Sequence, residues 1–296
     1  MSAEVVWMKT NEQKQMVTQA LDELASALER GESEQLKAYL STLGRFHRYS
    51  VGNVLLIAMQ RPGATHVAGF RTWQKLGRQV KEGEKGIRIF APIVWRVKKA
   101  ERQEGSDGED IEELVRFRSV CVFDVAQTDG KPLPEFAQTG GEPGEHTHRL
   151  MQFAVEQGIE VEFSDALVSA HGLSAGGKII VRKGLSAAEG FSVLAHELAH
   201  ELLHRDQDEP LSRTVRETEA EAVAFVVCQA VGLEAVNAAA DYIKLYQGSK
   251  ETLLESLQRI REAAVEIIGA MTRKESAEGG GVEWQGAGEP QIARAA

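Results

Sequence analysis

The sequence predicts an α+β protein of two domains: N-terminal helices followed by an antiparallel sheet, then a mainly helical domain with a small sheet. Three observations predict this class. Apolar residues recur at helical spacing near both ends of the chain. β-branched and aromatic residues gather in strand-like runs between 67 and 125. A stretch rich in Pro and Gly, from Asp129 to Glu145, lacks any periodicity and is typical of an interdomain linker.

The first elements along the chain are predicted to be amphipathic helices. Residues 10–30 place apolar side chains at helical spacing, and a second helix is expected after Gly31. A third apolar segment begins at Ser50, a residue type that caps helices. It stops before Pro62 and Gly63, which break a helix and start a turn.

Three β-like segments are expected to form the antiparallel sheet, at 67–70, 86–97 and 114–125. The last two flank an acidic, Gly-containing stretch that is typical of a long hairpin tip. Cys121 falls in the third segment and Cys228 in a helical pattern, without CxxC spacing. We therefore expect two core thiols rather than a disulfide or a four-cysteine zinc site.

The second domain is expected to begin with a helix at 146–157, followed by strands at 159–163 and 178–182 and by further helices. The end of the chain carries no core pattern. We therefore predict a first domain at 1–130, a linker at 131–145, a second domain at 146–273 and a flexible tail at 274–296.

Composition places the chain among soluble globular proteins. Of its 296 residues, 43% are hydrophobic and 26% are charged, which argues against a disordered chain. No apolar run is long enough to span a membrane. The N-terminus lacks the basic start and the apolar core of a signal peptide. We therefore expect a cytoplasmic protein with no membrane partner.

The charges are segregated along the chain. The formal net charge is −10, which by itself argues against binding of nucleic acid. Between Arg45 and Lys99, however, twelve Lys and Arg residues stand against two acids, a local balance of +10. Attraction to phosphate depends on such a patch rather than on the sum, so the first domain is a candidate for nucleic-acid binding.

Aromatic residues are interleaved with these cations. Binding of single strands needs cations along the phosphates and flat side chains on which unpaired bases stack. The candidates for stacking are Phe46, Tyr49, Phe70 and Trp73. The candidates for phosphate contacts are Arg45, Arg48, Arg71, Lys75, Arg78, Lys81, Lys85 and Arg88. Two alternatives stay open: a merely solvated basic surface, and aromatic side chains that belong to the core.

The strongest chemical signal is LAHELAHELLH at 194–204, an HExxH motif in a helical pattern. Residues four apart on a helix project to the same side, so His196 and His200 can share one Zn²⁺ ion. Glu197 is then placed beside the metal-bound water as general base. The apolar residues of the helix form a stripe on the opposite side. The alternative is two solvated histidines on an amphipathic helix.

A third ligand is expected from the helix that begins near Arg216. Glu217 and Glu221 are four apart and share a face, whereas Glu219 points nearly opposite. This pattern favours a His-His-Glu site with Glu217 as third ligand and Glu221 orienting a histidine ring. An exchange of these two roles stays open, as does a purely solvated acidic face. Zn²⁺ is the expected metal, and Mn²⁺ or Co²⁺ could occupy the same ligands.

Two neighbouring features complete the predicted site. His204 continues the series of histidines, but it lacks the Gly turn and the spacing of a further histidine ligand, so we expect it at the rim. The strand at 178–182 comes shortly before the metal helix. It is either an edge strand that pairs with an extended peptide or a purely structural strand.

These segments together resemble a known family. The string SVGNVLLIAMQRPGATHVAGFRTWQKLGRQVKEGEKGIRIFAP, with VFDVAQTDGKPLP after it, resembles the N-terminal single-stranded-DNA-binding domain of ArdC-type antirestriction proteins. The part with LAHELAHELLH and RETEAEAVAFVV resembles their zincin-like, gluzincin-type metallopeptidase domain. The resemblance implies zinc ligands at His196, His200 and Glu217, with Glu197 as the catalytic residue.

The resemblance also implies a function. It indicates an antirestriction protein that protects incoming plasmid DNA from host restriction during conjugation. The implied partners are single-stranded DNA, an unidentified protein or peptide substrate, and the host restriction machinery. Two alternatives stay open: a DNA-occluding binding protein whose metal site is only structural, and a regulatory metalloprotease that cleaves a repressor.

Overall fold

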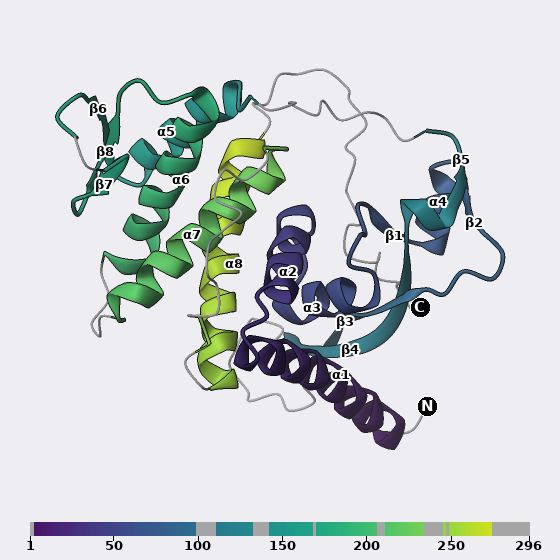
Figure 1. Cartoon of the computed structure of the whole chain (residues 1–296). Helices are drawn as coiled ribbons and strands as arrows, with labels where there is room; N and C mark the ends of the chain where they lie inside the picture. Colours follow the sequence, from purple (N-terminus) through teal and green to yellow (C-terminus); the bar gives the residue numbers. More distant parts are fainter. Residues whose placement is uncertain are drawn as a thin grey trace, which may run out of the picture. The chain divides into compact units, whose positions relative to one another are not determined.

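The computed structural model shows helices and small sheets in the order that the sequence predicts (Figure 1). The residues that it describes are 3–98, 111–132, 142–167, 170–205, 211–233, 245–246 and 249–273. The middle of the predicted linker, the predicted hairpin tip and the predicted tail lie outside these residues.

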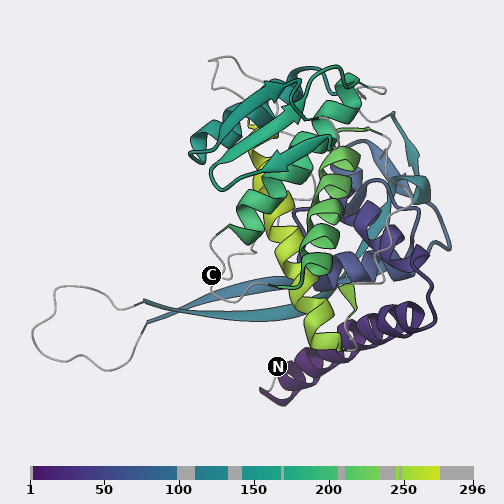
Figure 2. The same cartoon turned by 60° about the vertical axis from the view of Figure 1, so that its left-hand side comes forward.

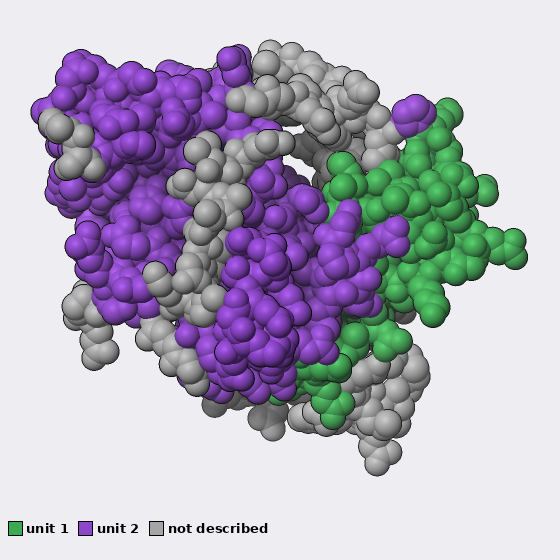
Figure 3. Space-filling model, in the orientation of Figure 1, with its two compact units in different colours: residues 1–19, 64–131, 281–296 green, residues 20–63, 132–280 purple. Residues whose placement is uncertain are grey.

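The chain divides into two compact units, each discontinuous in sequence (Figure 3). Unit 1 comprises Met1–Gln19, Ala64–Lys131 and Gly281–Ala296, and unit 2 comprises Ala20–Gly63 and Pro132–Gly280. The long helix α1 (Ala3–Glu29) runs from the first unit into the second. The predicted domains therefore differ from the compact units over residues 20–63, which group with the C-terminal part of the chain. The predicted boundaries stay a prediction about separable domains.

Unit 1 is built on antiparallel strands. One sheet has the order β1-β4-β3, and β3 and β4 form the long hairpin seen in Figure 2. The elements of unit 1 after α1 are β1 (Val67–Gly69), α4 (Phe70–Lys75), β2 (Arg78–Val80), β3 (Ile87–Lys98), β4 (Ile111–Asp124), η1 (Val125–Gln127) and β5 (Thr128–Gly130). A second sheet pairs β2 with β5. The sequence did not predict α4, β2 or β5, because six or fewer residues carry too little periodicity.

Unit 2 has a helical core. Its helices after α1 are α2 (Glu34–Arg45), α3 (Val51–Gln60), α5 (Glu145–Glu156), α6 (Ala187–His204), α7 (Arg213–Ala230) and α8 (Lys250–Thr272). Helices α2, α6 and α8 all pack against α7 (Figure 1). Helix α2 approaches α7 closely at Gly44, where an added Cβ would lie 3.0 Å from the Gln229 Cβ. This packing explains why residues 20–63 belong to unit 2.

A small three-stranded sheet completes unit 2. Its order is β6-β8-β7, with β6 (Glu160–Ser164) parallel and β7 (Gly172–Ser174) antiparallel to β8 (Lys178–Arg182). Of the two alternatives for 178–182, the structure excludes the edge strand and leaves the structural strand, because β8 pairs on both sides. The edge strand that contacts α6 is β7. With three residues, β7 is too short to be recognised in the sequence.

The predicted α+β class is confirmed: helices and small antiparallel sheets come first, and a helical region with a small sheet follows. Ser50 caps α3 as predicted, because its hydroxyl accepts a hydrogen bond from the Asn53 amide at 3.3 Å. Cys228 is buried as expected, but Cys121 is exposed. Among the described residues, no helix has the length and apolar character needed to cross a membrane.

Candidate functional site

The HExxH residues lie in the C-terminal half of α6. The helix begins with a capping box in which Ser186 accepts from the Glu189 amide and the Glu189 carboxylate accepts from the Ser186 amide. Its apolar stripe is buried, with Phe191 and Leu198 fully inaccessible. The histidine side is consequently turned away from the core, as the helical period predicts.

Three ligand atoms converge between α6 and α7. The Nε2 atoms of His196 and His200 are 3.1 Å apart, and the Oε2 atom of Glu217 lies 3.7 Å from the first and 3.5 Å from the second. Metal–ligand bonds of 2.0–2.1 Å in tetrahedral geometry put neighbouring ligands at roughly 3.3 Å from each other. The donor set and its spacing therefore fit one divalent ion, and in the described part of the chain these three residues form a group that could hold a metal.

Glu221 contacts the opposite side of the His196 ring. Its Oε2 atom lies 3.3 Å from Nδ1 of His196. Burial favours the neutral ring, yet the Glu221 hydrogen bond and the nearby carboxylates together raise the pKa of His196. Burial and the proximity of His196 lower the pKa of His200. A carboxylate on Nδ1 fixes the tautomer that leaves Nε2 free for a metal.

Glu197 faces the edge strand β7. An added Cβ on Gly172 would lie 2.5 Å from Oε1 of Glu197 and 2.6 Å from Cγ1 of Val193, so a side chain at this position would displace the carboxylate. Burial raises the pKa of Glu197, the neighbouring His196 opposes this effect, and the Glu217 carboxylate adds to it. The carboxylate thus lies next to the strand edge and near His196.

Glu201, one residue beyond the motif, fixes the turn between β7 and β8 to α6. Its carboxylate accepts hydrogen bonds from the Ser174 hydroxyl at 2.6 Å and from the amides of Gly176 at 3.0 Å and Gly177 at 2.7 Å. The side chain is fully buried. Burial favours its neutral form, but these hydrogen bonds outweigh that effect and lower the pKa of Glu201. Sequence reasoning missed this residue, because nothing local distinguishes it from a solvated glutamate.

Glu219 points away from the metal group, as the helical period predicts. It is fully buried and forms a bidentate ion pair with Arg259 of α8, with the shortest N–O distance 2.6 Å. The side chain of His204 is 3% exposed, and its Nε2 atom lies 3.2 Å from the Arg216 carbonyl oxygen. The expectation that His204 lies at the rim is therefore wrong: the ring is packed between α6 and α7, and burial lowers its pKa to about 4.

The predicted stacking residues divide between the two units. Phe46 and Tyr49 belong to unit 2, where Phe46 is 7% exposed and packs edge-on against Tyr49. Trp73 of unit 1 is 1% exposed, and its indole nitrogen donates to the Phe123 carbonyl at 2.9 Å. A buried ring offers no face to a base, so Phe46 and Trp73 are corrected to core residues. Phe70, at 48% exposed, is accessible for stacking.

The predicted phosphate contacts divide in the same way. Arg45 and Arg48 lie in unit 2, and the other six lie in unit 1. Two of those six form hydrogen bonds within unit 1. Arg78 donates to the carbonyl oxygens of Thr128 and Gly130, and Lys81 donates to the Ala126 carbonyl. The other four predicted contacts in unit 1, Arg71, Lys75, Lys85 and Arg88, are exposed.

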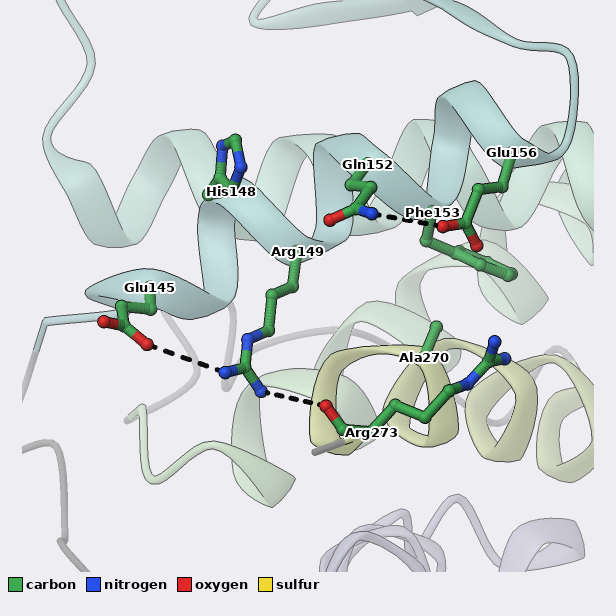
Figure 4. Close-up of a pocket in the computed structure, with 8 residues that line it drawn as sticks. All are labelled: Glu145, His148, Arg149, Gln152, Phe153, Glu156, Ala270 and Arg273. Atoms are coloured by element: carbon green, nitrogen blue, oxygen red, sulfur yellow. Dashed lines mark hydrogen bonds and ion pairs between the residues drawn. The ribbon is translucent and has the colours of Figure 1, made fainter. Parts of the chain in front are cut away.

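A cavity of about 470 Å³ lies between α5 and α8, and it contains none of the metal-ligating residues. Figure 4 shows Arg149 between Glu145 and the C-terminal end of α8. The Arg149 guanidinium donates to the Met271 carbonyl at 2.9 Å. Arg149 therefore caps the C-terminal end of α8. The cavity is separate from the candidate metal site.

The chain matches a known family over its N-terminal part. Residues 10–123 match the model of the family described as the N-terminal domain of anti-restriction factor ArdC. The match includes most of the sequence string on which the resemblance rests, and it confirms the predicted ArdC type.

Two solved structures share the fold of nearly the whole chain. Metal-free ArdC from the R388 plasmid has a TM-score of 0.52 and is covered over 86% of this chain and 97% of its own. The Mn(II)-bound structure of the same protein has a TM-score of 0.54, with 88% and 99% covered. Both are 18% identical to this chain, so the likeness shows the fold.

One curated relative is the uncharacterized protein pXO2-81 of Bacillus anthracis. It is 24% identical over 312 residues, which cover 90% of this chain and 53% of the relative. The chain therefore spans about half the length of this relative.

Proposed function

We propose that this chain is a cytoplasmic antirestriction protein that binds single-stranded DNA and hydrolyses a peptide bond at a divalent-metal site, and so protects incoming plasmid DNA from host restriction during conjugation. The observation that carries the catalytic part is the convergence of three ligand atoms beside a partly buried carboxylate. The family match of residues 10–123 carries the antirestriction part.

His196, His200 and Glu217 would hold the metal, as the spacing of their ligand atoms allows. Zn²⁺ is the expected ion for this donor set, and Mn²⁺ is supported by the related ArdC structure that contains it. A bound ion would polarise a carbonyl group and lower the pKa of a water molecule.

The remaining chemistry belongs to side chains of this protein. Glu197 would take the proton of the attacking water and deliver it to the leaving amine, the role of a general acid and base. Glu221 would hold the His196 ring in position. The outer edge of β7 would align an extended peptide by strand pairing, since β7 ends the small sheet next to α6.

The DNA-binding part rests on charge and on family membership. The segment from Arg45 to Lys99 has a local balance of +10 in a chain whose net charge is −10. Single-stranded DNA is the partner that suits such cations when exposed aromatic rings lie among them. The host restriction machinery is the further partner in this proposal.

The decisive experiment replaces Glu197 by Gln in the full chain. We expect Glu197→Gln to bind Zn²⁺, Mn²⁺ and a single-stranded oligonucleotide as the wild type does, because the ligand atoms are unchanged. We expect it to lose cleavage of a fluorescein-labelled casein probe and to lose protection of an unmodified plasmid that is transferred into a restricting recipient. Glu189→Gln, at the start of the same helix, is the matched control.

The outcomes separate the competing functions. If Glu197→Gln retains full protection, the protein acts by occluding DNA and its metal site is structural. If Glu197→Gln still protects the plasmid but no longer produces the repressor fragments that the wild type produces, the chain is a regulatory protease. A wild-type protein that binds neither metal nor single strands would contradict the proposal as a whole.

A further inference from the structure

Part of one face of the β3–β4 hairpin in unit 1 presents aromatic, polar and cationic side chains to solvent, although Phe90 on the same face is buried. Directly opposed residues of antiparallel strands point to the same face, and alternate residues along a strand share it. Arg88 of β3 is opposed to Cys121 of β4, and both are exposed. Phe117 and Phe123 lie on this face too, four residues before Cys121 and two after it.

The ring of Phe123 is seated over a glycine. An added Cβ on Gly86 would lie 3.1 Å from Cζ of Phe123 and 2.8 Å from Cβ of Cys121. The absence of a side chain at Gly86 therefore leaves room for the tip of the Phe123 ring. Phe70, the first residue of α4, stands edge-on to this ring at a centroid distance of 6.5 Å and an interplanar angle of 70°.

These rings are held in place but are not covered. Phe70 is 48% exposed and Phe117 is 40% exposed, whereas Trp73, three residues after Phe70 in α4, is 1% exposed. Phe123 is half-buried, so together with the exposed Phe70 it forms a contiguous apolar surface. Such a contiguous patch points to a binding site more than a scattered single residue does. A stacking surface requires this combination of a fixed ring and an open face.

Exposed cations occur in the elements next to the ring pair. Arg71 and Lys75 are exposed on α4, Lys85 is exposed just before β3, and Arg88 is exposed in β3. Among the described residues, no acidic side chain pairs with Arg71, Lys75 or Lys85. The described acids between 64 and 98 are Glu82 and Glu84, and Glu84 accepts a hydrogen bond from Gln127 at 2.8 Å.

We propose that unpaired bases of single-stranded DNA stack on Phe70 and Phe123, with Phe117 as a further stacking ring along the same strand and with Arg71, Lys75 and Arg88 on the phosphates. This inference rests on the proposed DNA binding and moves the stacking surface from Trp73 and Phe46 to the sheet face. The occupant is a polyanion with flat apolar groups, because the exposed cations Arg71 and Lys75 lie on the same helix as the exposed Phe70 ring. An apolar protein segment would leave the charges of Arg71 and Lys75 unmatched.

The test compares an intact fluorescein-labelled 20-mer with an abasic 20-mer of the same length, both titrated with the full-length protein. We expect Phe70→Leu to weaken binding of the intact strand by roughly 5- to 150-fold, the range for one lost stacking contact. Binding of the abasic strand should not change, because it has no base to stack. Phe70→Trp should restore the affinity.

Phe163→Leu is the matched control, since Phe163 is 43% exposed and lies on β6 of unit 2. A second readout uses 2-aminopurine in the strand, whose fluorescence falls when the base stacks. The wild type should quench it, and Phe70→Leu should not. Equal melting temperatures for both variants would show that the fold is intact.

Two results would overturn the stacking surface. If the wild type binds the intact strand but Phe70→Leu and the double variant Phe70→Leu/Phe117→Leu bind it equally well, the surface is wrong and DNA binding stands. If the wild type binds neither strand, the proposed DNA binding fails and the stacking surface fails with it.

Discussion

The candidate metal centre of unit 2 and the aromatic face of unit 1 are built in opposite ways. Around the metal centre, charged side chains are buried and hold one another: Glu201 accepts three hydrogen bonds, and Glu219 forms an ion pair with Arg259. On the aromatic face, Phe70 and Lys75 extend into solvent.

This difference predicts which substitutions change the free energy of unfolding and which change only ligand affinity. A buried charge that loses its partner destabilises the fold, whereas an exposed side chain contributes little until a ligand covers it. Substitutions near the metal centre should therefore change both metal affinity and the free energy of unfolding. Substitutions on the aromatic face should change ligand affinity alone.

The largest effect is expected at the metal ligands. His200→Ala and Glu217→Gln should each lower the affinity for Zn²⁺ or Mn²⁺ by more than about 100-fold, because each removes one of three ligand atoms. Glu221→Gln should cost about 10- to 100-fold, since it acts through the His196 ring. Isothermal titration with each metal measures the difference. A larger loss for Glu221→Gln than for Glu217→Gln would exchange their assigned roles.

The next effect concerns the buried ion pair between α7 and α8. Glu219→Ala should lower the free energy of unfolding by about 3–5 kcal/mol, because it leaves the Arg259 guanidinium without its buried partner. The double variant Glu219→Leu/Arg259→Met should recover much of this loss. Urea denaturation followed by circular dichroism measures both. Glu162→Ala, which removes an exposed partner of Lys178, is the control and should leave the midpoint unchanged.

The metal centre could be predicted from the sequence because its geometry is local. His196 and His200 are one helical turn apart, and the period of a second helix separates Glu217 and Glu221 from Glu219. Only the contact between α6 and α7 depends on tertiary structure, and the short connection between these two helices favours that contact. The sequence alone does not decide between Glu217 and Glu221 as third ligand, because these residues are one turn of α7 apart.

The aromatic face could not be predicted residue by residue because burial is a tertiary property. Trp73 and Phe70 lie on the same short helix with the same cations around them, yet one is in the core and the other is exposed. Cys121 was expected in the core, but its side of β4 is open. Strand β7 has only three residues and therefore no recognisable pattern. The anchoring role of Glu201 depends on a hydrogen bond from the last residue of this strand, so it could not be recognised either.

A smaller effect contrasts the two aromatic residues of α4. Trp73→Phe should destabilise the protein by about 1–3 kcal/mol, because it leaves the Phe123 carbonyl without its buried donor and removes packed atoms. Phe70→Leu should change the free energy of unfolding by about 0.5 kcal/mol or less, as is usual for an exposed position. Denaturant titrations of both variants measure this. Equal destabilisation would show that Phe70 is a core residue and would weaken its assignment to stacking.

The smallest effect concerns single cations and sharpens the contrast within unit 1. Lys75 is exposed on α4, whereas Lys81 donates to the Ala126 carbonyl at 3.0 Å and lies 3.6 Å from the Asp129 carboxylate. If Lys75 contacts a phosphate, Lys75→Ala should reduce the slope of log affinity against log salt by about 0.7 and weaken binding roughly fivefold or less. Lys81→Ala should leave the slope unchanged, because its charge is already used within the sheet. Fluorescence anisotropy with a single-stranded oligonucleotide at several salt concentrations measures both slopes. A reduced slope for Lys81→Ala with none for Lys75→Ala would place the phosphate path along β2 rather than α4.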